Sequence, residues 1–562
     1  MPPRLRLDRV IFAAGPRTGG PQLSVDLTTT AVIVGPNNSG KSLALKEIER
    51  WCVVREETRK VVSEIQASYP ESANEAEQLL LAFRAAVPLG QVEAPGVVWV
   101  GQHTFRPEEP VLHFQANVES VRSAADNVDE STLRSFLLKL YAIRLDGRTR
   151  FLLSDPKPSG DLQLPPQNHL WALFQNDDAR QRVRKLTAEA FGLHFTVDPT
   201  AMQQFRIRLN PREPTSAAEE QALDSAARAY HSEASLIGDL SDGVQAYSGL
   251  ISAVMSLPHR VMLIDEPEAF LHPTLARRLG HDLADLAAER QGNLIVATHS
   301  ADFLIGCLEA SPQTAIVRLT FEQGVATARS LSAVDLTVLM RDPLLRSTGA
   351  LRGLFHRAVV ITEADSDRAF YDEANRRLQD QGRGVPDALW INAQNWQTIP
   401  RVMSPLRRLG IPAAAIIDLD TLTEGGPWGA FYDAIAASDQ DRASLEASRA
   451  AAEAELRGVG PAVYKPRGTA GLSGNARAIV ENCVQALAAF GVFVVPVGEL
   501  EGWLASLGVA RGRKRDWIVA TFAALGSDPS GSGYVQPGED DVWAFLDGLR
   551  SWSANVDRQG IP

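Results

Sequence analysis

The sequence predicts an α/β protein with two domains, each built on a parallel sheet. Its 562 residues exceed what one hydrophobic core usually holds, since domains typically contain about 100 to 200 residues. Short apolar runs typical of buried strands alternate with helical stretches, and this alternation starts again after the segment LLRSTGALRGLFHR. We therefore expect one domain over residues 1–345, interrupted by a mainly helical insertion at 103–230, and a second domain over 352–562 that includes a C-terminal extension.

The amino-acid composition limits the classes of protein to which this chain could belong. Hydrophobic residues make up 45% and charged residues 22%, as in ordinary globular proteins, and the net charge of -12 allows nucleic-acid binding only at a local groove. The cysteines Cys52, Cys307 and Cys483 are far apart and lack the spacing of a zinc site or a disulfide framework. We find no apolar run long enough for a signal peptide or membrane span, so we expect a cytoplasmic protein.

A glycine-rich loop lies between a predicted buried strand, which ends at residue 34, and the helical stretch LALKEIERW. The loop satisfies the pattern GxxxxGK[ST], which in this context cradles nucleotide phosphates. Its backbone N–H groups and the helix N-terminus face phosphate, the lysine reaches the β- and γ-phosphates, and the final hydroxyl binds Mg²⁺. The predicted ATP-binding residues of this loop are Gly35, Pro36, Asn37, Asn38, Ser39, Gly40, Lys41 and Ser42.

An apolar strand later in the chain ends in two adjacent acids. The run VMLIDE places Asp265 and Glu266 directly after buried positions, an ending that packing does not require. In a nucleotide site Asp265 would lie near Mg²⁺ and Glu266 near the attacking water. The strand NLIVAT precedes His299, which is either a sensor of the γ-phosphate or a histidine of the core.

Further segments carry a family resemblance. Ser241 and Gly243 lie in LSDGVQ, which opens a helix, Gln102 follows the strand VVWVG, and EPEAFLHP follows the acidic strand. Together these motifs resemble the ABC-class ATPases of the RecF, SMC and overcoming-lysogenization-defect (OLD) groups over about residues 5–340. The resemblance implies a signature at Ser241 and Gly243, a Q-loop residue at Gln102, a switch histidine at His299, and head-to-head dimers around two ATP molecules. The insertion is too short for an SMC coiled-coil arm. We expect it to serve dimerisation, with a DNA-contacting arm as the alternative.

Carboxylates follow two strands of the second domain. The strand AVVIT delivers Glu363 at its carboxyl end, where ligands of open α/β sheets gather. Asp367 opens the next helix, where it either joins that site or caps the helix. The strand AAAII ends in Asp418 and Asp420, and alternation along an extended chain would turn both carboxylates to one side. Converging carboxylates suit Mg²⁺ or Mn²⁺, and two such ions can bracket a phosphodiester during hydrolysis.

The segments EADSD, LGIPAAAIIDLD and GELEGWL resemble the Toprim domain of OLD-family nucleases over about residues 352–520. The basic run RGRKR that follows either holds DNA phosphate or is a solvated surface. The resemblance implies that Glu363 is a metal ligand or general base, that Asp418 and Asp420 are the metal-binding pair, that Asp367 and Glu501 serve a second ion, and that Lys514 is the catalytic lysine. Where the family has glycine after the motif glutamate, this sequence has Ala364, which adds a β-carbon beside the metal.

These assignments favour an ATP-hydrolysing, Mg²⁺- or Mn²⁺-dependent DNA endonuclease that acts in antiphage defence or DNA repair. The expected partners are DNA, further copies of the chain in a dimer or larger homo-oligomer, and a companion helicase-like or other defence protein. The alternative is a nucleotide-sensing ATPase whose Toprim-like domain binds a partner or DNA without cutting. Topoisomerase or primase chemistry is disfavoured, because the sequence shows neither a tyrosine-bearing cleavage domain nor a zinc-binding segment.

Overall fold

The computed structural model describes residues 4–16, 20–53, 58–103, 111–322, 324–332, 336, 340–555 and 557–561. The chain forms two compact units, the first over residues 1–34 and 38–333 and the second over 35–37 and 334–562. Both are α/β units, as expected, and helix α15 (Pro343–Thr348) belongs to the second. Within the described residues, no helix has the length and apolar character needed to cross a membrane.

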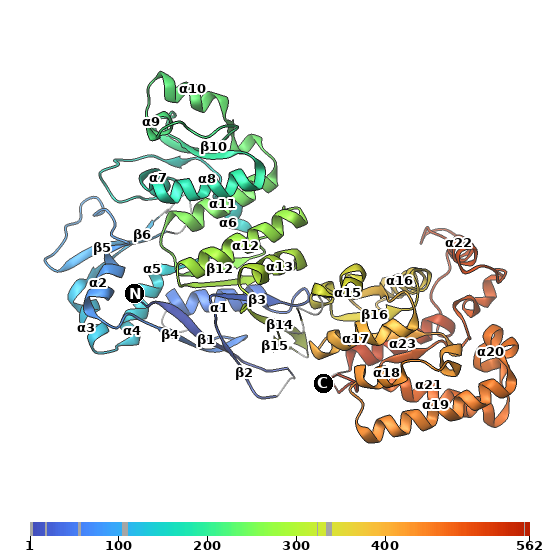
Figure 1. Ribbon diagram of the computed structural model, residues 1–562. Helices are drawn as coiled ribbons and strands as arrows, with labels where there is room; N and C mark the ends of the chain where they lie inside the picture. Colours follow the sequence, from blue (N-terminus) through green and yellow to red (C-terminus); the bar gives the residue numbers. More distant parts are fainter. Residues whose placement is uncertain are drawn as a thin grey trace. The chain divides into compact units, whose positions relative to one another are not determined.

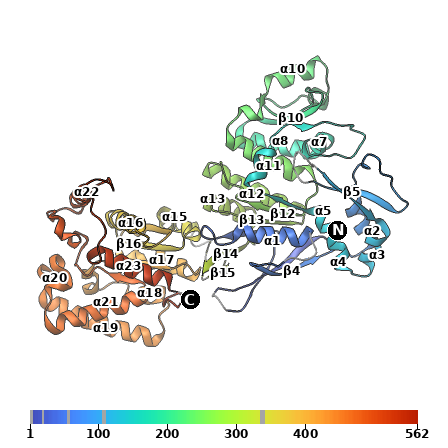
Figure 2. The same cartoon turned by 180° about the vertical axis from the view of Figure 1, so that it is seen from behind.

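The first unit is organised around a six-stranded sheet in the order β15-β14-β3-β13-β12-β7. β3 (Thr30–Val34), β13 (Asn293–Ala297) and β12 (Val261–Asp265) are parallel and almost wholly buried, because helices cover both faces of the sheet. Figures 1 and 2 show α1 (Lys41–Val53) on one side and α12 (Pro273–Glu289) with α13 (Ala301–Ala310) on the other. The strands near residues 30 and 260–300 therefore share one sheet, which confirms the sequence-based prediction.

Helices make up more of the described residues in 103–230 than strands do, as expected, but the stretch is not an insertion separate from the sheet. β7 (Ala142–Leu145) pairs with β12 in the central sheet, so this stretch contributes to the core of the first unit. The other strands here are β6 (Val111–Asn117), β8 (Lys157–Pro158), β9 (His194–Asp198) and β10 (Gln204–Asn210). These strands are short, and β7 carries an arginine at its third position, so period-2 alternation is too brief to stand out beside the helical runs.

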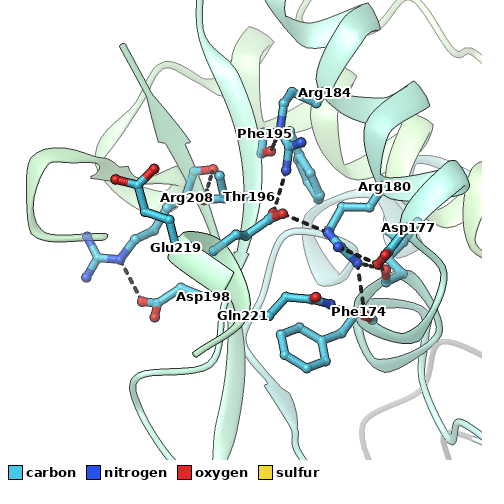
Figure 3. Close-up of polar contacts among 12 residues, drawn as sticks. Phe174, Asp177, Arg180, Arg184, Phe195, Thr196, Asp198, Arg208, Glu219 and Gln221 are labelled. Carbon is cyan, nitrogen blue, oxygen red and sulfur yellow. Dashed lines mark hydrogen bonds and ion pairs between the residues drawn. The ribbon is translucent and has the colours of Figure 1, made fainter. Parts of the chain in front are cut away.

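A small lobe within this stretch packs around buried charges. α8 (Asp177–Phe191) presents Arg180 and Arg184 to the carboxylate of Glu220, and the arginine-to-carboxylate distances are 3.0 and 2.6 Å. Figure 3 shows Arg180 also facing Asp177, and the guanidinium of Arg208 directed at Asp198. Buried ion pairs hold their partners in one geometry, because an unpaired charge here would be costly. The lobe is thus a folded part of the unit.

The rest of the first unit surrounds the sheet. A three-stranded sheet of order β2-β1-β4 and a two-stranded β5–β6 pair lie beside it. A large apolar cluster, which includes Leu7, Leu45, Leu138 and Leu263, joins the small sheet, α1 and the central sheet. The remaining elements of this unit are β1 (Arg6–Phe12), β2 (Leu23–Asp26), β4 (Val62–Ser68), α2 (Ala73–Leu81), β5 (Val97–His103), α3 (Val118–Asp126), α4 (Glu130–Leu133), α5 (Lys139–Tyr141), α6 (Gly147–Leu152), α7 (His169–Gln175), α9 (Ala217–Gln221), α10 (Ser225–Glu233), β11 (Ser235–Leu236), α11 (Asp242–Ser256), β14 (Ala315–Glu322) and β15 (Val325–Leu331).

The second unit contains a four-stranded parallel sheet in the order β17-β16-β18-β19. β16 (Ala358–Thr362) and β18 (Ala413–Ile417) are fully buried at its centre, between β17 (Ala388–Asn392) and β19 (Val492–Val494). The chain passes from β16 outward to β17 and then returns to the other side of β16. Adjacent strands β16 and β18 therefore form the switch point where open α/β sheets bind ligands at their carboxyl ends.

Helices cover this sheet. A separate apolar cluster, which includes Val360, Phe370, Trp503 and Trp543, forms the core of the second unit. The helices are α16 (Asp365–Asp380), α17 (Ile399–Arg408), α18 (Trp428–Ala434), α19 (Asp439–Val459), α20 (Pro461–Arg467), α21 (Gly474–Ala489), α22 (Lys514–Leu525) and α23 (Asp541–Ala554), with short 3₁₀ turns η3 (Ala350–Phe355), η4 (Trp396–Thr398), η5 (Leu419–Thr423), η6 (Gly468–Gly471) and η7 (Leu500–Gly502). The strands predicted at AVVIT and AAAII are confirmed, and the third, within VFVVPV, is limited to three residues.

Candidate functional sites

The glycine-rich loop follows β3 and ends at the first residue of α1, as predicted. Gly35, Asn38 and Gly40 have φ values of 143°, 60° and 93°, a region that side chains rarely adopt. This sequence of turns lets the backbone curl tightly before the helix begins. Lys41 is 6% exposed, and its Nζ donates to Ser39 Oγ at 3.4 Å. The loop therefore holds its lysine at the start of α1, where a P-loop requires it.

Asp265 and Ser42 lie together at the carboxyl end of the central sheet. The Ser42 hydroxyl hydrogen-bonds the Asp265 carboxylate. Burial raises the pKa of Asp265, and this hydrogen bond partly offsets the rise. The two predicted Mg²⁺ ligands of the nucleotide site are thus adjacent, one from α1 and the other from β12.

Glu266 and His299 face each other beside this pair. His299 Nε2 lies 3.8 Å from Glu266 Oε1, and Glu266 has a φ of 51° although it is not glycine. Such backbone strain is typical of functional sites, because surrounding structure must enforce it. The buried carboxylate of Glu268 accepts a hydrogen bond from the His299 N–H at 2.8 Å. His299 is therefore held at the strand end by an acid that the sequence did not single out.

Arg150 fixes the loop that carries Glu266. It lies in α6, is 2% exposed, and donates to the backbone oxygens of Asp265 at 3.2 Å, Ala269 at 3.3 Å and Glu266. An arginine fork suits several carbonyls at once. Sequence analysis did not single out this residue, because residues 103–230 carry no catalytic motif and were interpreted as an insertion. A charged residue within an otherwise helical run gives no signal of burial.

The two remaining nucleotide-site predictions differ in placement. Ser241 occupies the N-cap position of α11 without a side-chain capping hydrogen bond. Gly243 lies in the first turn of α11, where a β-carbon would approach the carbonyl oxygen of Phe270 at 3.0 Å. The predicted helix start is confirmed, and it lies against the loop after Glu266. Gln102 pairs with Leu112 in the β5–β6 ladder. Its Q-loop role stays a prediction.

In the second unit, Glu363 and Asp418 meet at the switch point of the sheet. The Asp418 N–H donates to Glu363 Oε1 at 3.0 Å, and the Thr421 hydroxyl donates to the same oxygen at 3.4 Å. Burial raises the pKa of Glu363 to about 7, helped by the charges of Asp367 and Asp420. Burial likewise raises the pKa of Asp418, and Glu363 adds to the rise. The two strand ends therefore lie side by side, joined by the hydrogen bond from the Asp418 backbone to Glu363.

Asp367 caps its helix, which is one of the two roles that the sequence allowed, and its other oxygen faces Lys514. It is 5% exposed, and its Oδ2 accepts from the N–H of Ala364 at 3.1 Å, which caps α16. Its Oδ1 lies 3.0 Å from Lys514 Nζ, and the same ammonium lies 3.7 Å from Asp418 Oδ2. Ala364 has φ −131° and ψ 170°, an extended conformation that any residue adopts, so its β-carbon causes no backbone strain.

Lys514 balances the acidic cluster. Burial acts to lower its pKa, but the charges of Asp418 and Asp367 outweigh that effect and raise it. Glu501, on η7, contributes a smaller attraction in the same direction. Lys514 is the first residue of α22, and its neighbours Arg511, Arg513 and Arg515 are exposed. The basic run thus directs one cation into the cluster and leaves the others at the surface.

Asp420 is oriented differently from the prediction. The chain turns into η5 directly after Asp418, so the two acids do not alternate along an extended strand. Asp420 Oδ2 instead lies 2.7 Å from Nζ of Lys465, and that ammonium is 3.3 Å from Glu499 Oε1. The hydrogen bond to Asp420 raises the pKa of Lys465. Lys465 belongs to α20 and was missed, because its segment carries no recognisable motif.

The acidic cluster, defined as Glu363, Asp367, Asp418 and Asp420, has a donor set suited to a hard divalent cation. In the described part of the chain, no three His, Cys, Asp or Glu side chains are arranged to hold a metal as they stand. Lys514 takes up two of the carboxylates and Lys465 a third. The residues fit such an ion chemically, since like charges are crowded in a buried place, and a bound ion would compete with the two lysines for these carboxylates.

Comparisons with known proteins concern mainly the first unit. Residues 113–306 match the family model of an AAA domain described as a putative AbiEii toxin of a Type IV toxin–antitoxin system. No curated protein matches the sequence. Among solved structures, an SMC head bound to the C-terminal winged-helix domain of ScpA is 15% identical with a TM-score of 0.33, covering 58% of this chain and 98% of that one.

Two other SMC heads are similar to a comparable degree. The head domain from Thermotoga maritima is 13% identical with a TM-score of 0.29, covering 58% of this chain and 99% of that one. The Pyrococcus furiosus head with an extended coiled coil, bound to the C-terminal domain of ScpA, is 11% identical with a TM-score of 0.27, covering 60% and 98%. The chain thus combines a glycine-rich P-loop and an adjacent Asp265–Ser42 pair with a region, residues 113–306, that is similar to an AAA domain.

Proposed function

We propose that the chain is an ATP-dependent, Mg²⁺- or Mn²⁺-dependent DNA endonuclease of OLD type, in which the second unit is a Toprim domain that cuts DNA. The observation that carries the proposal is the acidic cluster at the switch point. Glu363 and Asp418 follow adjacent buried strands and lie in hydrogen-bonding contact. A parallel sheet positions ligands at this edge, and packing alone gives no reason to bury acids there.

The side chains have distinct proposed roles. Glu363, with a pKa of about 7, can accept a proton from an attacking water near neutral pH. Asp418, Asp420 and Asp367 would hold the divalent ions, with Glu501 near the second. A bound ion supplies Lewis-acid stabilisation of the phosphodiester. Lys514, released from Asp367 and Asp418, would then neutralise charge that develops on the phosphate.

The first unit would supply nucleotide-driven control. Lys41, Ser42 and Asp265 bind ATP and its Mg²⁺, and Glu266 with His299 faces the γ-phosphate in this proposal. We infer head-to-head dimers, with Ser241 and Gly243 of each copy completing the site of the other. The toxin–antitoxin description of the matched family agrees with a role in antiphage defence, and DNA repair is the other setting that this chemistry suits.

Plasmid nicking tests the proposal. We expect the full chain to nick or linearise supercoiled DNA with Mg²⁺ or Mn²⁺ and not with EDTA. Asp418→Asn should reduce cutting by more than about a hundredfold, because even changes to residues that only orient a metal ligand cost 10- to 100-fold. The matched control Asp433→Asn alters an exposed acid of α18 and should cut like wild type.

A second variant tests whether ATP binding and DNA cutting depend on different sites. Lys41→Ala should abolish nucleotide binding while the acidic cluster keeps its metal affinity. Wild-type protein that never cuts supercoiled, linear or single-stranded DNA, with or without ATP, would refute the nuclease and favour a non-cleaving module. Cutting that survives Asp418→Asn would show that the catalytic site lies elsewhere.

A further inference from the structure

A positively charged cavity lies beside the acidic cluster in the second unit. Its volume is about 420 Å³, and it runs along β17, the edge strand of the sheet, and around the end of that strand. Helix α15, η3 and the start of α16 supply its other walls. The residues that matter here are Thr348, Arg352, Arg368, Trp390, Asn392 and Gln394.

The charged residues that line the cavity are all positive. Arg352 and Arg368 line it, and none of the described lining residues is acidic. Arg368 is neutralised in part by Asp365, whose carboxylate lies 2.8 Å from its Nε and also accepts from Asn392. Arg352 is exposed, and its guanidinium forms no ion pair or hydrogen bond with any residue that the structure describes. An available guanidinium beside amide and hydroxyl groups is suited to an oxyanion, above all phosphate.

Strand register relates this cavity to the cutting site. Asn392 pairs with Thr362, the residue before Glu363, so the cavity begins one strand away from the motif glutamate. Neighbouring strands are separated by about 4.8 Å. A nucleic-acid strand carries a phosphate about every 3.4 Å along the duplex axis. A strand whose reacting phosphate lies at Glu363 would therefore place its next phosphates beside the cavity, which Arg352 and Arg368 line.

We propose that this cavity is a binding subsite for a backbone phosphate that flanks the reacting one, with Arg352 as its main contact. The inference rests on the proposed nuclease function and adds where the substrate lies: across the carboxyl end of β16 and then over β17. Backbone contacts of this kind position DNA without reading its sequence. The cavity should thus strengthen binding to all sequences equally.

The salt dependence of DNA binding tests this subsite. Anisotropy of a fluorescent 30-base-pair duplex is titrated with the full chain in EDTA between 50 and 200 mM salt. One lost phosphate contact should reduce the slope of log affinity against log salt by about 0.9. Arg352→Ala should therefore bind more weakly at 50 mM, and its loss of affinity between the two salt concentrations should be about 3.5-fold smaller than that of wild type.

Two control variants test whether the effect is specific to the charge at position 352. Arg357→Ala removes an exposed arginine at the opposite, amino-terminal end of β16 and should reproduce the wild-type slope. Arg352→Lys keeps the charge and should retain most of the slope. Equal melting temperatures of the Arg352 variants and wild type would show that the fold is intact, as expected for an exposed side chain.

Each outcome decides between explanations. Wild-type protein that binds DNA with a slope unchanged by Arg352→Ala would overturn the subsite and leave the nuclease proposal standing. Wild-type protein that binds no DNA would overturn both. A third arm titrates inorganic phosphate in a thermal-shift assay. Stabilisation by millimolar phosphate that Arg352→Ala removes, with the DNA slope unchanged, would make the cavity a small-anion site and refute nucleic-acid binding there.

Discussion

Glu363→Gln tests whether the acidic cluster is electrostatically unfavourable in the metal-free protein. Burial raises the pKa of Glu363 from its usual 4.5 to about 7. A raised carboxyl pKa means that the folded protein favours the neutral form more than the unfolded chain does. The stability that Glu363 contributes is therefore complete below about pH 4.5 and is lost as the pH rises through about 7.

The magnitude follows from that difference in pKa. At 1.36 kcal/mol for each pKa unit, ionised Glu363 costs the folded state about 3 kcal/mol at pH 8. Glutamine keeps an oxygen that can accept the Asp418 N–H but carries no charge. We expect Glu363→Gln to be about 2 to 3 kcal/mol more stable than wild type at pH 8, and less than about 1 kcal/mol more stable at pH 5.

Thermal unfolding in EDTA between pH 5 and 8.5 measures this gap. For a unit of this size each kcal/mol moves the melting temperature by about 2 to 4 °C, so the variant should melt about 4 to 12 °C higher at pH 8. Glu481→Gln, which changes a half-exposed acid of α21, should show no such rise. A variant that melts below wild type at pH 8, or a gap that does not change with pH, would refute the electrostatic reasoning.

Two further predictions concern the first unit. Arg150→Ala should reduce single-turnover ATP hydrolysis by about 10- to 100-fold while nucleotide affinity in a titration changes little, since Arg150 positions the loop of Glu266 rather than ATP. A large loss of ATP affinity would contradict that role. Glu220→Ala leaves Arg180 and Arg184 buried without their acid and should lower the unfolding free energy by about 3 to 5 kcal/mol in denaturant titrations, whereas a cost below about 1 kcal/mol would show that the lobe relaxes around the charges.

Strands that end in the candidate site residues were predictable from the sequence. β3, β12, β16 and β18 are apolar runs in which nearly every position is buried, and such runs stand out from their surroundings. The residue that follows each run lies at the carboxyl edge of a parallel sheet, whatever the rest of the chain does. That is why Asp265 and Ser42, or Glu363 and Asp418, could be paired before any coordinates were known.

Two of the side chains that neutralise or orient these acids, Arg150 and Lys465, could not be predicted in the same way. Arg150 and Lys465 come from a short helix each, and they reach their partners only because tertiary packing brings those helices to the sheet edge. The orientation of Asp420 was not predictable either. A local 3₁₀ turn begins directly after Asp418 and replaces the expected alternation of an extended strand. Periodicity carries no information on contacts between segments that are distant in sequence.

Both sites hold acids in places that are unfavourable without a counter-ion. Burial raises the pKa of Asp265 and Glu268 in one unit, and of Glu363 and Asp418 in the other. A cation that binds only the folded state stabilises it. At a free concentration of 100 times its dissociation constant, the cation adds about 2.7 kcal/mol to the free energy of unfolding. That is close to the cost of ionised Glu363 at pH 8. If the proposed function is right, saturating Mg²⁺ should therefore raise the melting temperature of wild type more than that of Glu363→Gln, because the charge that the ion compensates is absent from the variant.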